Sequence, residues 1–557
     1  MTISRKFLLC LLSVAALAFV ACTDDNGGDN GGGGDVPTED IVDKVSQYEA
    51  RKFDGEKRAG VFYEIFVRSF ADSDGDGIGD LQGITDKLDY LDDLGVSGIW
   101  LTPIHPSDSY HGYDVIDYKG INPDFGTMED FEKLIAEAHK RDIRVILDYV
   151  LNHSSKLNPW FRAACADANS PYRDFYNFSS QDHSGQWGWH KVHGSNDWYF
   201  GDFDSSMPDL NYGPAASCAT NATFLALVDA AKFWIDKGVD GFRLDAVKHI
   251  YDNQTNNDNP TFLNTFYTTL NKYFQGKSAL GYKDLYMVGE CWMGHGDMAK
   301  YYKGLPALFD FTAWENWMLY AIQNSHAKWF PKDIIGAQNT FKNYRSDYIH
   351  ATKLSNHDEN RARTALGGSS ALSLERAKMA GAILLTSAGS PFIYYGEEIG
   401  MMGNKSTGDE NVREPMLWAP KAEDTHRTTW MTAKNNFDLG PGTVKTLAED
   451  VNSIYNVYRK FMRLRNTYPA LANGTIELPE GFSDSDTNNK QVMVFYRTAG
   501  SERLLVVHNV SDKQSTHVVK HAIKAPVADM NKVTIETKSQ TEHILTMPAY
   551  SSIIIEL

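Results

Sequence analysis

Residues 241–249 read GFRLDAVKH, a short apolar run that passes directly into ionisable side chains. Seven other short runs rich in β-branched and aromatic residues alternate with longer amphipathic stretches from residue 61 onward. This alternation is typical of repeated strand and helix units. The eight strand candidates, in chain order, are 61–67, 98–101, 145–149, 241–244, 286–289, 308–311, 352–354 and 392–395. Eight such units predict a closed (β/α)8 TIM barrel.

The interval between the third and fourth strand candidates is too long for a single crossover. About ninety residues from Leu151 precede the next strand, where one helix with its loops needs far fewer. The interval is rich in Trp, Tyr, Asn, Asp and Ser. We therefore expect an irregular insert over the barrel mouth, residues 151–212, which divides the barrel into residues 48–150 and 213–467.

Beyond the barrel the sequence pattern changes. Residues 454–465 have the periodicity of a helix, and from about residue 471 alternating strand candidates such as 492–496 and 504–508 follow. This pattern predicts a C-terminal antiparallel β-sandwich over residues 468–557.

Length and charge limit the class of protein. At 557 residues, of which 42% are apolar and 12% aromatic, the chain can bury more than one core, so we expect a multi-domain globular protein. The formal net charge of −18 disfavours nucleic acid as a partner, because a phosphate backbone calls for a basic surface. A neutral polymer such as a polysaccharide is compatible with this charge.

The first residues have the layout of an export signal. Arg5 and Lys6 precede an apolar run, residues 7–20, which is too short to cross a bilayer comfortably. We therefore expect a cleaved signal peptide over residues 1–21.

The residues around Cys22 resemble the processing site of bacterial lipoproteins. That resemblance implies a lipid on Cys22, with an ordinary cleaved signal as the alternative. The Gly/Asn/Asp-rich stretch that follows predicts a flexible tether over residues 22–47. Its acidic start resembles the export tags of surface lipoproteins in some Gram-negative bacteria. We expect an exported protein anchored to the outer membrane and facing the cell surface, with the periplasmic face as the alternative.

Three cysteines belong to the part of the chain expected to fold: Cys165, Cys218 and Cys291. An oxidising compartment permits a disulfide between Cys165 and Cys218, and two separate buried thiols are equally compatible with the sequence. No Cys/His spacing in the sequence suggests a zinc site.

Acids and histidines follow several of the strand candidates. The third strand runs into DYVLNH at residues 148–153, the fifth ends in VGE at 288–290, and the seventh is followed by NHD at 356–358. A single acid near a strand end is commonly a cap or a surface residue. Because four successive examples, including GFRLD, meet at the carboxyl end of a barrel, where barrel active sites lie, they indicate a catalytic centre.

At this point the sequence resembles glycoside hydrolase family 13, the α-amylase family. The four segments match its signature regions in order and spacing, and MPDLN at residues 207–211 matches a fifth region in the insert. GYDV at 112–115 and REPM at 413–416 also fit. The resemblance covers roughly residues 58–557.

The resemblance implies roles for individual residues. Asp245 would be the nucleophile, Glu290 the general acid/base, and Asp358 a third acid that grips the ring hydroxyls of the distorted sugar. The residues implied in substrate binding are Tyr113, Asp114, His153, Arg243, Lys248, His249 and His357. Of these, Tyr113 would stack under the sugar ring and Asp114 would hold His153 or Arg243 in place.

Retaining hydrolysis of a glycosidic bond independently calls for this set. It uses a nucleophilic carboxylate and a second carboxyl, about 5–5.5 Å apart, that protonates the leaving oxygen. Arg243 lies two residues before Asp245, so in a strand the two side chains share a face and the guanidinium would keep Asp245 ionised. Glu290 should have a raised pKa, because it must enter the cycle protonated.

Residues 72–80 read DSDGDGIGD, a dense set of oxygen ligands that suits calcium. An EF-hand is excluded, because its last ligand would fall on Gly83. The segment resembles a calcium loop of some α-amylase-family enzymes, with a solvated acidic turn as the alternative reading. The implied ligands are Asp72, Asp74, Asp76, the Ile78 carbonyl and Asp80. The resemblance also raises a second structural calcium site at Asn152, Asp209 and the carbonyl of His249.

Within the family, two features narrow the expected substrate. Lys248 and His249 resemble the pair that contacts leaving-group sugars in α-amylases, and MPDLN resembles a group between oligo-1,6-glucosidases and neopullulanases. We expect an endo-acting α-amylase that cleaves α-1,4 bonds in starch, glycogen or maltooligosaccharides. The alternatives are an exo-acting α-glucosidase, a neopullulanase-like enzyme, and a surface glycan-binding protein without catalysis.

The insert is rich in aromatic residues, namely Trp187, Trp189, Trp198 and Tyr199. They predict either a platform on which sugars stack or the core of a small insert.

Overall fold

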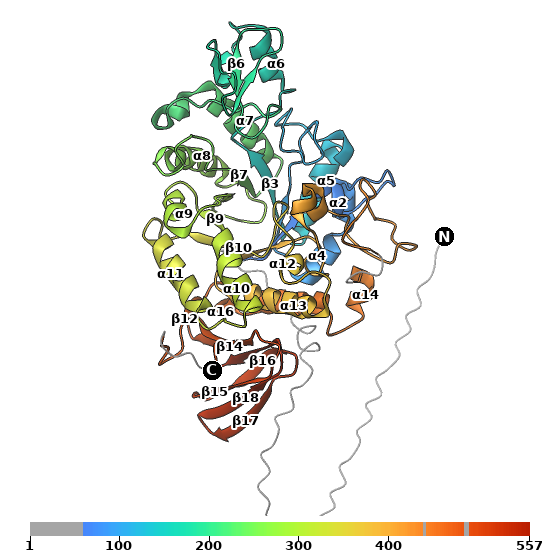
Figure 1. The fold of residues 1–557 in the computed structure, drawn as a ribbon, viewed down its shortest axis with the longest axis vertical. Coiled ribbons are helices and arrows are strands. Elements are labelled where there is room, and N and C mark those ends of the chain that lie inside the picture. Colours follow the sequence, from blue (N-terminus) through green and yellow to red (C-terminus); the bar gives the residue numbers. More distant parts are fainter. Residues whose placement is uncertain (1–59, 438–441, 484–488) are drawn as a thin grey trace, which may run out of the picture. The chain divides into compact units, whose positions relative to one another are not determined.

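A computed structural model of the protein describes residues 60–437, 442–483 and 489–557 (Figure 1). The expected signal peptide (1–21), the lipid site at Cys22 and the tether (22–47) lie outside the described residues. Within the described part of the chain, no helix is both long and apolar enough to cross a membrane.

Eight parallel strands close into a barrel in the order β1-β11-β10-β9-β8-β7-β3-β2 (Figure 1). The predicted TIM barrel is confirmed, and every strand candidate overlaps one barrel strand. The strands are β1 (Phe62–Ile65), β2 (Gly98–Leu101), β3 (Arg144–Val150), β7 (Gly241–Asp245), β8 (Tyr286–Gly289), β9 (Ala307–Asp310), β10 (Ile349–Lys353) and β11 (Ser390–Tyr394).

The barrel interior is a packed apolar core, in which Phe62, Trp100, Phe309 and Phe392 are all buried. Toward the carboxyl ends of the strands the buried side chains become polar. The indole of Trp100 donates a hydrogen bond to Asp148 at 3.2 Å, at the boundary between the two layers. The apolar layer thus supports a polar layer that contains the strand-end acids.

Helices surround the strands, and α5 illustrates why they form. Thr127 and Asp130 make a reciprocal capping box at its start, and its buried residues recur at helical spacing on the face toward the barrel. The helices around the barrel are α2 (Val67–Phe70), α3 (Leu81–Asp86), α4 (Leu88–Leu94), α5 (Met128–Lys140), α7 (Ala222–Asp236), α8 (Asp258–Phe274), α9 (His295–Tyr301), α10 (Leu319–Gln323), α11 (Phe330–Lys342), α12 (Ala362–Ala365), α13 (Ala371–Thr386), α14 (Val444–Ala448), α15 (Ile454–Thr467) and α16 (Pro469–Ala472).

The insert after β3 contains α6 (Pro159–Ala166) and a small sheet of β4 (Phe178–Ser179), β5 (Trp189–Lys191) and β6 (Trp198–Phe200). Its aromatic residues differ in exposure. Tyr199 is buried against Phe161, whereas the Trp187 side chain is 81% exposed.

The C-terminal part forms two antiparallel sheets, as predicted. One has the order β12-β13-β14-β19-β16 and the other β15-β18-β17. Val507, Leu545 and Ile553, from both sheets, share one apolar core. The strands are β12 (Thr475–Glu477), β13 (Val492–Ala499), β14 (Glu502–Asn509), β15 (Ser515–Val519), β16 (Ala525–Met530), β17 (Thr534–Ser539), β18 (Glu542–Met547) and β19 (Ser551–Glu556).

The two readings of the cysteines are resolved by their state in the structure. Cys165, Cys218 and Cys291 are all free thiols, so Cys165 and Cys218 are not bridged. Cys218 and Cys291 are buried and Cys165 is half-buried.

Candidate active site

A cavity of about 430 Å³ opens among the loops that follow the barrel strands. It collects side chains from segments far apart in the sequence. The expected site residues that line it are Tyr113, His153, Asp245, Lys248, His249, Glu290 and Asp358. The other expected residues, Asp114, Arg243 and His357, are buried and do not line it.

Arg243 lies at the centre of the acids, fully buried at the end of β7. Its Nη1 lies 2.8 Å from Oδ1 of Asp245, and its Nη2 lies 2.6 Å from Oε2 of Glu290. Nη1 also donates to both carboxylate oxygens of Asp148, at 2.8 and 2.9 Å. One planar guanidinium therefore fixes three carboxyl groups.

The strand register explains this arrangement. Asp148 on β3 pairs directly with Arg243 on β7, two residues before Asp245. Side chains two apart in a strand point to the same face, so Arg243 and Asp245 both face the barrel axis. Residue 246, immediately after the strand, has φ 46°, an uncommon value for alanine, and its N–H donates to Oε2 of Glu290 at 3.1 Å.

The charge state of Asp245 differs from the simple expectation. Burial raises its pKa well above the usual range, Arg243 opposes that rise, and the carboxyl groups of Glu290 and Asp148 add to it. Sequence reasoning assigned the guanidinium to Asp245 alone, whereas the structure divides it among three acids. A cluster with more carboxylates than cations binds a proton readily, as a site with one acid and one base requires.

Asp358 is held by three cations, one of which is Lys405, whose Nζ lies 3.5 Å from Oδ1 of Asp358. Its Oδ2 lies 2.9 Å from Nε2 of His357, and its Oδ1 lies 3.0 Å from Nη2 of Arg413. Although burial acts in the opposite direction, these positive charges hold the pKa of Asp358 well below its usual range. Asp358 is therefore an anion at neutral pH.

His357 is in turn fixed by Glu64 at the end of β1, with 2.6 Å between Nδ1 and Oε1. Burial lowers the pKa of His357, but the charges of Asp358 and Glu64 outweigh burial and raise it to about 9. Tyr113 bridges the two groups of acids, because its hydroxyl lies 2.5 Å from Nε2 of His357 and donates to Asp148 at 2.9 Å.

His153 has an unused hydrogen-bonding atom at the cavity. Among the described residues, its buried Nε2 has no hydrogen-bond partner. Burial lowers its pKa to about 4, so the ring is neutral at pH 7 and carries one N–H.

Residues 64–474 match the family model for the α-amylase catalytic domain, and residues 492–554 match the one for the C-terminal domain of α-amylase SusG. The chain belongs to the α-amylase family of glycoside hydrolases. The curated relatives agree. The chain is 36% identical to α-amylase SusG of Bacteroides thetaiotaomicron, over 91% of this chain and 92% of that protein. It is 39% identical to α-amylase 3 of Dictyoglomus thermophilum, over 89% and 93%.

A solved α-amylase from H. orenii has the same fold, with a TM-score of 0.78 and 36% identity over 90% of this chain and 99% of that one.

In this α-amylase-family enzyme, Asp114 does not contact Arg243 or His153 through a hydrogen bond, contrary to expectation. It accepts hydrogen bonds from the hydroxyls of Ser107 and Ser109 and from the N–H of Asp108 at 3.2 Å. Asp114 therefore fixes the loop after β2, and Asp148 holds Arg243 instead.

The sequence pattern predicts no role for several residues that the structure places at the site. Glu64 lies inside the first strand, where no sequence pattern distinguishes it. Arg413 begins the REPM segment, which predicts no role for the individual residue. Trp292, two residues after Glu290, lines the cavity 38% exposed and stacks on Phe311 with ring centroids 4.4 Å apart. The sequence signal that could have identified Trp292 is its position, two residues after the acid that follows a strand.

Lys248 and His249 lie at the rim near Trp292. The Nζ of Lys248 donates to the Trp292 carbonyl at 3.1 Å, and Nδ1 of His249 lies 3.0 Å from Oδ2 of Asp202. Lys248 is thus held beside Trp292, whereas the ring of His249 lies 5.0 Å from that of Phe203 in the insert.

The acidic loop after β1 brings together Asp72, Asp74 and Asp80, which offer carboxylate oxygens within 4.8 Å of one another. Asp76 is not part of that group; its carboxylate accepts from the N–H of Ile78 at 2.7 Å. The expected second site is also assembled in part, because the N–H of Leu210 donates to the Asn152 carbonyl at 2.8 Å and so holds Asn152 next to Asp209, whose pKa burial raises to about 7.

Proposed function

We propose that the protein is a retaining, endo-acting α-amylase that hydrolyses α-1,4 bonds of starch, glycogen or maltooligosaccharides. The observation that carries the proposal is the single guanidinium of Arg243 bound to both Asp245 and Glu290 at the floor of the cavity. A retaining glycosidase needs two carboxyl groups held close together on either side of one bond. The guanidinium of Arg243 holds Asp245 and Glu290 as such a pair.

In the first step, a carboxylate oxygen of Asp245 attacks the anomeric carbon while the bond to the leaving oxygen breaks. Glu290 gives its proton to that oxygen. In the second step, Glu290 takes a proton from a water whose oxygen attacks the same carbon, and the bond to Asp245 breaks. Asp245 returns as a carboxylate and Glu290 as an acid, so the cycle closes.

The other cavity residues bind the sugar that becomes positively charged. The anionic Asp358 accepts hydrogen bonds from ring hydroxyls, and Nε2 of His153, which has no partner within the described residues, donates a hydrogen bond to the same sugar. Tyr113 offers its ring as a stacking surface, while its hydroxyl is engaged by Asp148 and His357. Lys248, His249 and Trp292 bind the leaving-group side.

A time course on amylose, pullulan and a cyclodextrin, with the products resolved, tests this function. An endo-acting α-amylase releases a range of maltooligosaccharides from amylose at early times. Glucose as the sole early product would indicate an exo-acting α-glucosidase, panose from pullulan would indicate a neopullulanase-like enzyme, and no product would indicate a glycan-binding protein.

We further propose that the acidic loop binds a structural calcium ion. Oxygen ligands from Asp72, Asp74 and Asp80 suit this cation, with Asp76 and the Ile78 carbonyl as the remaining donors expected from the sequence. A second calcium at Asn152, Asp209 and the His249 carbonyl is the weaker of the two candidates. Neither ion has a part in the carboxylate chemistry.

We also propose that the enzyme is held at the outer membrane by lipid on Cys22 and faces the cell surface. The support is the export signal, the cysteine and the acidic, glycine-rich stretch after it. An enzyme in this position would act on polysaccharide outside the cell.

A further inference from the structure

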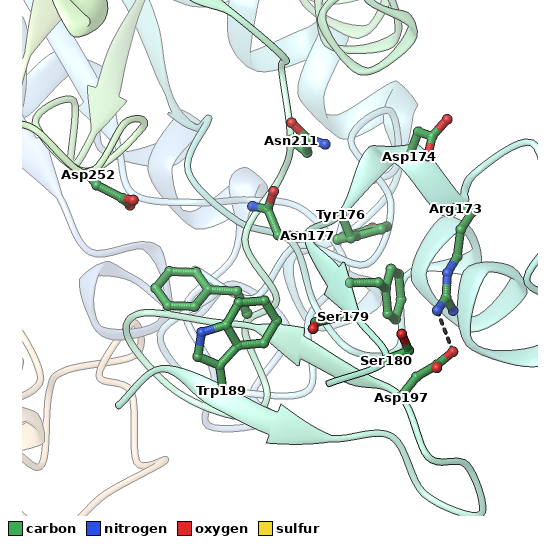
Figure 2. A pocket seen from close by; sticks show the side chains of 12 residues that line it. Arg173, Asp174, Tyr176, Asn177, Ser179, Ser180, Trp189, Asp197, Asn211 and Asp252 are labelled. Carbon is green, nitrogen blue, oxygen red and sulfur yellow. Dashed lines mark hydrogen bonds and ion pairs between the residues drawn. The ribbon is translucent and has the colours of Figure 1, made fainter. Parts of the chain in front are cut away.

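A second cavity, of about 630 Å³, is lined by residues of the insert and by Asp252 from the loop after β7, and we call it the insert cavity (Figure 2). None of the residues that line it lines the active-site cavity. Its volume lies in the range of small-molecule binding pockets. Neither the catalytic chemistry nor the proposed calcium sites uses it.

The walls of this insert cavity combine amides, carboxylates and aromatic rings. Asn177 precedes β4, Trp189 begins β5, and Asn211 and Asp252 come from two separate loops; Figure 2 shows them around one space. In the part of the chain that the structure describes, no hydrogen bond engages the Asn177 amide or the Asp252 carboxylate. These groups are available to a ligand.

The aromatic side is held in place. The ring of His183 stacks on Trp189 with centroids 3.9 Å apart and an interplanar angle of 10°. The rings of Trp189 and Phe200, which also lines the cavity, form an edge-to-face pair with centroids 5.5 Å apart. A fixed aromatic wall beside amides and carboxylates matches a sugar, which has apolar faces and a rim of hydroxyls.

Other ligand classes fit less well. The one cation of the cavity, Arg173, is already bound to Asp197 and lies 3.6 Å from the centroid of Phe178, so an anion finds no free partner (Figure 2). Among the described residues, the group of acids close enough to share a metal ion is in the Asp72 loop, not here. The walls of the insert cavity therefore favour a neutral ligand with several hydroxyl groups.

One segment, residues 207–211, leads from the active-site cavity to the insert cavity. Met207 lines the active-site cavity and Asn211 lines the insert cavity. Four residues of extended chain span at most about 14 Å. We propose that the insert cavity binds a segment of the α-glucan polymer at a site separate from the catalytic one. This inference rests on the proposed function. A second binding site would retain long or granular substrates on the enzyme.

The test compares Trp189→Ala and Asn177→Ala with the native full chain. Trp187→Ala is the matched control, because this indole is in the same loop, 81% exposed and outside the cavity. Three quantities are measured: retardation in native gels that contain amylopectin, hydrolysis of starch granules, and hydrolysis of a short chromogenic maltotrioside. Thermal melting verifies that each variant is folded.

We expect Trp189→Ala and Asn177→Ala to weaken amylopectin binding by about tenfold and to slow granule hydrolysis, because a stacking or hydrogen-bonding contact is lost. Hydrolysis of the maltotrioside should stay within about twofold of native, since a short substrate fills only the active-site cavity. Trp187→Ala should bind amylopectin as the native chain does.

Equal retardation of native and both cavity variants would overturn the proposal, and so would a parallel loss on granules and maltotrioside. Failure of the proposed function gives a different result, because a native chain that hydrolyses no α-glucan can still be retarded by amylopectin through the insert. If Trp189→Ala does not fold, Asn177→Ala decides, since its side chain makes no hydrogen bond within the described residues.

Discussion

Asp148 and Arg243 lie directly opposite each other on adjacent barrel strands, and both oxygens of the Asp148 carboxylate accept from Nη1 of Arg243, at 2.8 and 2.9 Å. Both side chains are fully buried. Because the same guanidinium contacts Asp245 and Glu290, the position of this proposed catalytic pair depends on a residue that does not line the cavity.

Asp148→Asn should therefore lower kcat/KM by roughly a hundredfold, the order of loss that accompanies a small misplacement of reacting groups. The negative charge of Asp148 raises the pKa of Asp245, so its removal should also move the acidic limb of the kcat/KM profile to lower pH. The pH profile checks both effects. A variant with an unshifted profile and native activity would show that Asp148 is not a positioning residue.

Asp245→Ala and Glu290→Gln should each reduce hydrolysis of amylose by at least about a thousandfold, because each removes one half of a two-carboxylate mechanism. Reducing-sugar assays measure the loss, and circular dichroism verifies the fold. His249→Ala serves as the comparison, with a smaller loss, since the role proposed for its side chain is to bind the leaving-group sugar and not to take part in the carboxylate chemistry. Substantial turnover by Asp245→Ala would exclude it as the nucleophile.

Calcium should stabilise the fold by roughly 2.7 kcal/mol at a hundredfold excess over Kd. Chelation should lower the Tm, and Asp74→Ala should lower it and remove most of the calcium response. Asp229→Ala, an exposed acid on α7, is the control and should respond to calcium as the native chain does. If chelation abolished the rate without moving the melting curve, the ion would belong to catalysis or substrate binding.

Glu397 is a buried acid after β11 that the mechanism does not use, with Ser355 and Tyr458 as its hydrogen-bond partners. Burial raises its pKa to about 8, so the folded protein keeps a proton that the unfolded chain gives up near its usual pKa of 4.5. Its contribution to stability is complete below pH 4.5 and is lost as the pH rises toward 8.

Glu397→Gln keeps the neutral form at every pH. The Tm of this variant should therefore exceed that of the native protein at pH 8 to 9, and the advantage should disappear near pH 5. Glu542→Gln, at an exposed position, is the control. Parallel melting curves across this pH range would contradict a buried neutral carboxyl.

Cys22→Ala should release the enzyme from the membrane fraction, because the proposed anchor is a lipid on that side chain. Fractionation followed by immunoblotting measures the release, and labelling of intact cells distinguishes the outer from the periplasmic face. Unchanged partitioning of Cys22→Ala would refute lipidation at this residue.

The sequence by itself determined the barrel and its strand-end acids. Each barrel strand is a short run of mostly apolar residues. Asp245 ends such a run, Glu290 directly follows one and Asp358 lies in the loop after one, so local pattern is sufficient to place them at one end of the barrel. The antiparallel C-terminal sheets were equally readable, because alternation of apolar and polar residues is also local.

Tertiary structure alone decided how these residues are held. Glu64 and His357 are 293 positions apart and meet only because β1 and the loop after β10 adjoin across the closed barrel. The pairing of β3 with β7 places Asp148 opposite Arg243, and the neighbouring strand ends divide one guanidinium among three acids. The insert aromatics likewise separated into core and cavity wall only on folding. Contacts between distant segments depend on register and packing, which no local pattern specifies.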